Sequence, residues 1–171
     1  MQMWSGLKRY AKHRWHDVHD AQRAVDAAMQ QRLEQRIAAS EQRHTGEVCI
    51  CVEAALPPSY LWRGASARER ALALFGKLHV WDTEHNNGVL IYLLLAEHAI
   101  ELVADRGLNR HVDAARWQAM ASHLSDALRA GRLEDGLTMA LEEVSAVLVE
   151  YFPLAAGTAR PNELPNRIDI R

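Results

Sequence analysis

Seven consecutive apolar residues, Val89 to Leu95, form the part of the sequence that most constrains the fold. The run is short for a buried helix and shows no polar alternation, so it predicts a strand covered on both faces. The segment 47–53 (EVCICVE) is a second short apolar run between charged residues, and it predicts another buried strand. A tight connection at 96–98 leads into a third strand at 100–104.

Helical periodicity accounts for much of the remaining chain. Apolar residues recur every four positions from Val25 to Ile37, and they predict a helix from about residue 20 that Gly46 stops. Ser66 and Glu69 have the spacing of a capping box, which opens a second helix. Two further helices are predicted over about 113–131 and 133–152.

The predicted order is therefore helix, strand, helix, strand, strand, helix, helix. A strand–helix–strand unit implies a parallel pair with a right-handed crossover. Strands that are apolar throughout imply helices on both faces, so we expect an α/β fold, a three-layer α/β/α sandwich with a small mixed sheet. We divide the chain into a basic aromatic and His-rich N-terminal segment, the α/β/α domain and a mobile C-terminal tail, at 1–19, 20–153 and 154–171.

Composition and charge limit the partners of the protein. A net charge of −2 over 171 residues gives no indication of nucleic-acid binding. No apolar run reaches the ~18 residues of a membrane helix, and the N-terminus lacks the features of a signal peptide, so we expect a cytoplasmic protein. The basic, Trp-bearing N-terminal segment is compatible with peripheral binding to the inner membrane face or to a membrane-protein complex. A helix packed against its own domain explains the tryptophans equally well. The sequence does not indicate an oligomeric state.

The two cysteines share one face of the first predicted strand. Cys49 and Cys51 flank Ile50, and a disulfide between such close neighbours is strained. We expect two buried, reduced thiols.

Polar residues gather where the predicted strands begin or end at one edge of the sheet. If strands 47–53 and 89–95 are parallel, both begin at the edge where strand 100–104 ends. Carboxylate and amide oxygens suit a hard cation such as Ca²⁺ or Mg²⁺. The candidate ligands at this rim are Glu47, Asp82, Glu84, Asn86, Asn87 and Asp105. The candidate catalytic residues are His44, His85 and Arg106.

Ordinary turn chemistry is the competing interpretation of the same residues. Asn87-Gly88 is a common way to enter a strand, since both residues tolerate positive φ. Asp82 is able to cap the preceding turn, and Asp105 is able to pair with Arg106. Ligands of open α/β sheets also favour the carboxyl ends of strands, whereas two of these three strands begin at the rim.

The segments TGEVCICVEA and NNGVLIYLLLAEHAIELVADRGL resemble the TPM domain. The likeness rests on Asn87-Gly88 before an apolar strand, a hairpin, and a second strand ending in Asp105-Arg106-Gly107-Leu108, and it covers about residues 25–152. It implies an α/β/α fold and, in some members, divalent-cation binding by an acidic cluster. Acid phosphatase activity is attributed to some relatives, and roles in the repair or assembly of membrane complexes to others. This sequence lacks the signal peptide and trailing membrane helix of many members, and has Asp105-Arg106-Gly107 where many have Gly-Tyr-Gly.

Two functions follow as hypotheses. In the first, the chain is an interaction or assembly module, non-catalytic or weakly catalytic, that binds a divalent cation at the rim. In the second, it is a metal-dependent phosphatase that hydrolyses phosphomonoesters. Asp82, Glu84 and Asp105 would then hold Ca²⁺ or Mg²⁺, Arg106 would neutralise charge, and His85 or His44 would protonate the leaving group. No nucleophile is evident in the sequence.

Overall fold

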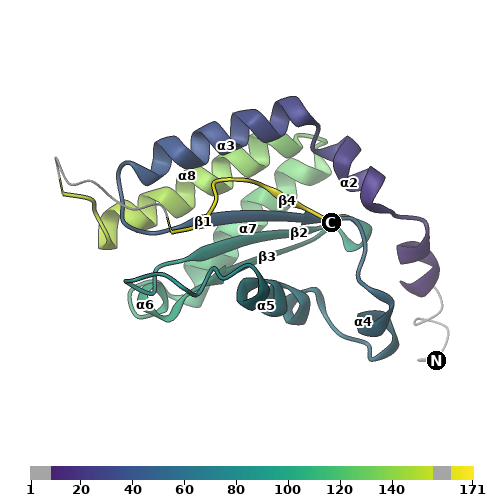
Figure 1. Cartoon of the computed structure of the whole chain (residues 1–171). Helices are drawn as coiled ribbons and strands as arrows, with labels where there is room; N and C mark the ends of the chain where they lie inside the picture. Colours follow the sequence, from purple (N-terminus) through teal and green to yellow (C-terminus); the bar gives the residue numbers. More distant parts are fainter. Residues whose placement is uncertain (1–8, 156–162) are drawn as a thin grey trace.

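A small mixed sheet lies between two layers of helices in the computed structural model, which describes residues 9–155 and 163–171 (Figure 1). The sheet has four strands in the order β3-β2-β1-β4. Helices α3, α7 and α8 cover one face, and α5 covers the other (Figure 1). The α/β sandwich that the sequence predicts is confirmed. The strands are β1 (Val48–Glu53), β2 (Val89–Leu94), β3 (Ala99–Ala104) and β4 (Asp169–Ile170). The helices are α2 (Val18–Ala24), α3 (Ala27–Glu41), α4 (Pro58–Trp62), α5 (Ala67–Lys77), the 3-10 turn η1 (Leu95–Glu97), α6 (Arg106–Asn109), α7 (Ala114–Arg129) and α8 (Leu133–Tyr151).

The strand β2 lies inside the sheet and contributes to two separate cores. It pairs in parallel with β1 and antiparallel with β3, as the sequence predicts. Val89, Ile91 and Leu93 pack in the core beneath α3, α7 and α8. Their neighbours Leu90, Tyr92 and Leu94 pack in the core beneath α5. Because both faces are covered, an uninterrupted apolar run is what this strand requires.

The single helix expected from residue 20 to Gly46 is two helices in the structure. The first, α2, ends at Ala24, and Asp26 then caps α3 by accepting a hydrogen bond from the Met29 amide at 2.8 Å. A side-chain cap of this kind satisfies an amide that the new helix leaves unpaired, which favours a break at this point. The structure also has two short helices, α4 and α6, that the sequence analysis did not predict.

The sequence analysis did not predict the fourth strand. It lies in the segment 154–171, where we expected a mobile tail, and it pairs in parallel with β1 through Asp169 and Ile170. The Arg171 amide donates to Val52 O at 3.0 Å, and the Arg171 carbonyl accepts from the Ala54 amide at 2.8 Å. Residues 169–171 therefore cover the end of one edge of β1, while residues 156–162 lie outside the described part of the chain.

The described part of the N-terminal segment packs against its own domain. Residues 9–14 are helical, and the buried His13 side chain accepts a hydrogen bond from the Leu56 amide at 3.0 Å. Its other ring nitrogen lies 2.8 Å from Glu97, to which Arg9 also donates at 2.6 Å. Trp15 is nevertheless 85% exposed. Residues 1–8, which include Trp4, lie outside the described residues. No described helix is long and apolar enough to cross a membrane.

Candidate functional site

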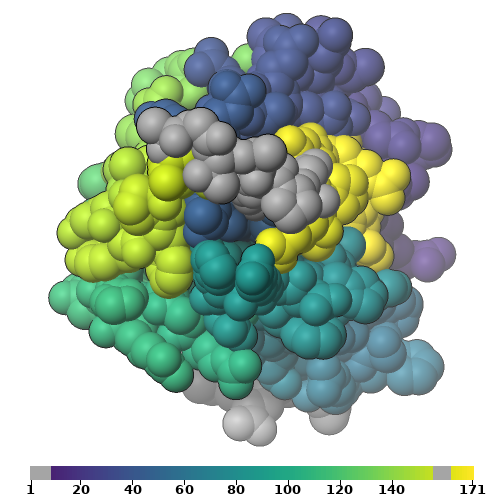
Figure 2. Space-filling model, turned by 60° about the vertical axis from the view of Figure 1, so that its left-hand side comes forward, coloured from purple at the N-terminus to yellow at the C-terminus, as the bar shows by residue number. Residues whose placement is uncertain are grey.

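Backbone hydrogen bonds join the three segments that the sequence analysis placed at the rim. The Asp105 amide donates to Gly88 O at 2.9 Å, and the Gly107 amide donates to Asn86 O at 2.9 Å. On the other side, the Val89 amide donates to Glu47 O at 2.9 Å. The loop before β2, the turn after β3 and the segment before β1 therefore meet on one face, where they appear in teal, green and blue (Figure 2).

Asn86 and Arg106 make the direct side-chain contact between the first two segments. The Arg106 Nε donates to Asn86 Oδ1 at 3.0 Å. Asn86 has a φ of 52°, a left-handed conformation that asparagine tolerates better than most residues. Gly107 lies so close to this loop that a Cβ there would be 2.7 Å from His85 O. The loop and the turn are thus fitted to each other at the level of the backbone.

Asn87 and Asp105 each have one buried side-chain oxygen without a hydrogen-bond partner in the described chain. The amide of Asn87 donates from Nδ2 to Thr45 Oγ1 at 3.1 Å, which leaves its Oδ1 unmatched. The carboxylate of Asp105 uses Oδ1 to accept from the Arg106 amide at 2.6 Å, which leaves its Oδ2 unmatched. Asn87 is 0% exposed and Asp105 is 9% exposed, so both oxygens are largely removed from water. Buried polar atoms of this kind normally have a partner.

The other predicted rim residues divide into exposed and buried groups. Asp82, Glu84 and His85 are exposed at the surface of the loop. Glu47 and His44 are buried, and His44 Nδ1 lies 3.0 Å from Gly46 O. The structure therefore does not gather all of the predicted residues around one point. Among the described residues, no group of three or more His, Cys, Asp or Glu side chains is arranged to hold a metal ion.

Glu163 is a rim residue that the sequence analysis missed. Its amide donates to Glu47 Oε1 at 3.1 Å, and its own Oε2 accepts from the Glu84 amide at 3.0 Å. It thus bridges the segment before β1 and the loop before β2. Nothing in the local pattern around Glu163 indicates this position, because the residue follows a stretch without periodicity.

Neither cysteine is suited to act as a nucleophile. Burial raises the pKa of the Cys49 thiol to about 12, and Asp169 adds to the shift. Burial raises the pKa of the Cys51 thiol as well, with a further contribution from Asp169 and Glu53. Because the thiolate is the reactive form, both residues are unreactive near neutral pH. Both cysteines are free, as expected from the sequence, but only Cys51 is fully buried, whereas Cys49 is partly buried.

Comparisons with known proteins agree with the family resemblance seen in the sequence. A family model, the TPM domain, matches residues 18–147. A search of the curated proteins finds no match. Eight chains among the solved structures match. One is the NMR structure of the BA42 protein from the psychrophilic bacterium Bizionia argentinensis, with 24% sequence identity and a TM-score of 0.73. The match covers 85% of this chain and 94% of that chain, and at this identity it shows the fold alone.

Proposed function

The chain belongs to the TPM domain family, and on that premise we propose that it is an interaction or assembly module that binds a divalent cation at the rim. Ca²⁺ and Mg²⁺ are the candidates, because both take carboxylate and amide oxygens. Asp105 and Asn87 would supply the buried ligands. Water would complete the coordination. A bound cation would fix the loop against the turn and so present a defined surface to a partner.

The observation that carries this proposal is the pair of unmatched buried oxygens, Asn87 Oδ1 and Asp105 Oδ2. A plain strand entry requires only the Asn-Gly pair, and it gives no reason to bury an unsatisfied carboxylate oxygen. Leaving a buried acceptor unsatisfied costs ~1–3 kcal/mol, and more for a charged group. A cation would remove this cost. The strand β2 below is packed on both faces and would hold the ligands rigidly, as a preorganised site requires.

Thermal unfolding with and without divalent cations tests the proposal. A cation that binds only the folded state at 100 times its Kd stabilises by ~2.7 kcal/mol, which is an upward Tm shift of ~5–11 °C for a chain of this size. Asp105→Asn retains the shape of the side chain and should abolish most of this shift. Asp126→Asn is the matched control, because Asp126 is an exposed aspartate on α7, in a different element from the rim. An unchanged Tm with Ca²⁺, Mg²⁺ and Mn²⁺ alike would refute cation binding.

A metal-dependent phosphatase is the alternative, and the exposed Arg106 guanidinium beside Asn86 is the observation that favours it. Arg106 would neutralise a phosphoryl group, and the exposed His85 would protonate the leaving group. His44 is less suited to this role, because it is buried and its Nδ1 lies 3.0 Å from Gly46 O. Hydrolysis of p-nitrophenyl phosphate with each metal, by wild type and by Arg106→Gln, tests this alternative. Activity that survives Arg106→Gln would exclude the rim as its source.

We further propose that the N-terminal segment associates with a membrane. The exposed Trp15 lies beside the exposed Lys12 and Arg14. This combination supports docking of a cytoplasmic protein on the anionic lipid surface of the inner membrane face. Flotation with vesicles containing phosphatidylserine at low salt is the test. Trp15→Ala should reduce binding, and absence of binding by the wild-type chain would refute the idea.

A further inference from the structure

The strand β3 forms an edge of the sheet whose outer side is open. The sheet order places β3 at one end, beside β2 alone. The Asp105 amide bonds to Gly88 O, and the register then directs the backbone groups of Glu101 and Val103 toward β2. The backbone groups of the alternate residues Ile100, Leu102 and Ala104 point away from β2. Exposed edges of this kind are templates for another strand.

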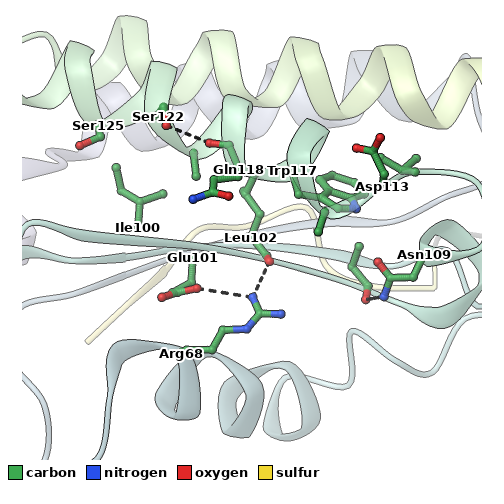
Figure 3. Close-up of a pocket in the computed structure, with 14 residues that line it drawn as sticks. Arg68, Ile100, Glu101, Leu102, Asn109, Asp113, Trp117, Gln118, Ser122 and Ser125 are labelled. Atoms are coloured by element: carbon green, nitrogen blue, oxygen red, sulfur yellow. Dashed lines mark hydrogen bonds and ion pairs between the residues drawn. The ribbon is translucent and has the colours of Figure 1, made fainter.

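A groove runs along this open edge. It has a volume of about 720 Å³ and lies between β3, α7 and Arg68 of α5 (Figure 3). Trp117 and Ala121 of α7 line one wall, and Leu102 lies on the strand opposite. The volume is within the range of ligand-binding clefts, ~300–1,000 Å³.

Side-chain donors already engage most of the outward carbonyls of β3. The Arg68 guanidinium donates to Leu102 O at 2.6 Å, and Asn109 Nδ2 donates to Ala104 O at 2.9 Å (Figure 3). Two of the three outward carbonyls are therefore already engaged. Within the described chain, the outward amides of the same strand have no acceptor. The indole Nε1 of Trp117 is likewise buried without an acceptor among the described residues.

We propose that this groove binds an extended peptide segment of a partner protein, which adds to the sheet as a strand beside β3. An extended backbone presents carbonyl oxygens on one side every second residue, at intervals of ~7 Å, and this spacing matches the outward amides of β3. A side chain of the peptide would fill the groove beside Trp117. The peptide would therefore be recognised by its backbone and by one apolar or acceptor-bearing side chain.

A second copy of this chain is a poorer occupant than a different peptide. If two copies paired through β3, the outward edge of each would face the same donors. The carbonyls of Leu102 and Ala104 that the second copy would offer to these donors are already engaged by its own Arg68 and Asn109, whereas a different peptide would offer carbonyls that are not engaged in this way. The inference does not depend on the cation site, because the groove and the unmatched oxygens of the rim involve different side chains.

Peptide selection on the full-length protein tests the proposal. The probe is a phage library of random peptides of about ten residues, followed by anisotropy measurements on selected synthetic peptides. Ala104→Pro removes one outward amide without removing a bond to β2, and Ala104→Ser retains the amide as the matched control. Ala121→Trp fills the groove, and Trp117→Phe removes only the indole donor. Circular dichroism and thermal unfolding show whether each variant is folded.

We expect Ala104→Pro and Ala121→Trp to weaken peptide binding by at least about tenfold, and Ala104→Ser to leave it unchanged. Amide hydrogen exchange gives a second measurement. In the free protein the amides of Ile100, Leu102 and Ala104 should exchange faster than those of Glu101 and Val103, and a bound peptide should protect all five. Should Ala104→Pro fail to fold, Ala121→Trp and the exchange pattern still test whether the peptide binds in the groove beside β3.

Three outcomes would overturn the proposal. The first is a library that yields no binding peptide. The second is peptides that bind wild type and Ala121→Trp equally. The third is concentration-dependent dimerisation that protects the β3 amides, which would assign the edge to a second copy.

Discussion

Replacing Arg70 by methionine should strongly destabilise the protein, because Arg70 neutralises a buried carboxylate. Glu53 at the end of β1 accepts from Arg70 Nε at 3.0 Å and from the Tyr92 hydroxyl at 2.6 Å. The exposed fractions of the Arg70 and Glu53 side chains are 11% and 4%. Removal of one partner from a buried pair costs ~3–5 kcal/mol, since the other charge remains buried and unpaired. The Tyr92 hydroxyl still donates in the variant, so we expect the lower end of this range.

Urea unfolding followed by circular dichroism measures this loss, and a double-mutant cycle isolates the interaction. In thermal unfolding, a loss of ~3 kcal/mol in Arg70→Met should lower the Tm by ~6–12 °C. Glu53→Gln combined with Arg70→Met should be more stable than Arg70→Met alone, because no unpaired charge is buried. A loss below ~1 kcal/mol in Arg70→Met, or additive effects in the double variant, would refute the reasoning.

Three further predictions concern the pH dependence of stability, the replacement of two glycines by alanine, and the reactivity of a cysteine thiol. Burial would raise the pKa of Glu97, but hydrogen bonds and charges from two N-terminal side chains hold it below its usual value. Its contribution to stability should therefore be present above pH ~4.3 and should disappear as the pH falls through the lower folded pKa. Urea unfolding midpoints of wild type and Glu97→Gln at several pH values measure this contribution. Gly107→Ala should cost ~1–3 kcal/mol, because its Cβ would approach His85 O to 2.7 Å, whereas Gly76→Ala, in open space within α5, should stabilise by ~0.5–1 kcal/mol. Thermal unfolding of the two alanine variants compares them. The Cys49 thiol, with a pKa raised to about 12 by burial, should react with iodoacetamide near pH 8 much more slowly than after denaturation, and equal rates would contradict the raised pKa.

Much of the fold can be predicted from the sequence because its signals are local. The apolar runs predict β1 and β2. The short connection between β2 and β3 predicts their antiparallel hairpin. The capping box at Ser66 is present as predicted, with Ser66 Oγ accepting from the Glu69 amide at 3.1 Å. The antiparallel pairing of β2 and β3 then correctly brings Asn86 and Arg106 into contact across the rim.

The remaining features depend on contacts that no local pattern reveals. The pair Asp169-Ile170 has no strand periodicity and is a strand only because β1 offers it an open edge. Glu163 reaches the rim for the same tertiary reason. The exposed positions of Asp82 and Glu84 depend on loop side-chain orientation, which topology alone does not determine.

The helical layer over β1 and β2 has a consequence for how the chain folds. It is built from the two ends of the domain, and Arg32 of α3 and Glu134 of α8 pair at 2.7 Å although they lie 102 positions apart. Contacts of such long sequence separation slow folding, because the loop must close before they contribute. During synthesis, the sheet face lined by Val89 and Ile91 would remain uncovered by α8 until that helix leaves the ribosome. Nascent chains that end before α8 should therefore be prone to aggregation and should bind chaperones, whereas chains that include it should not.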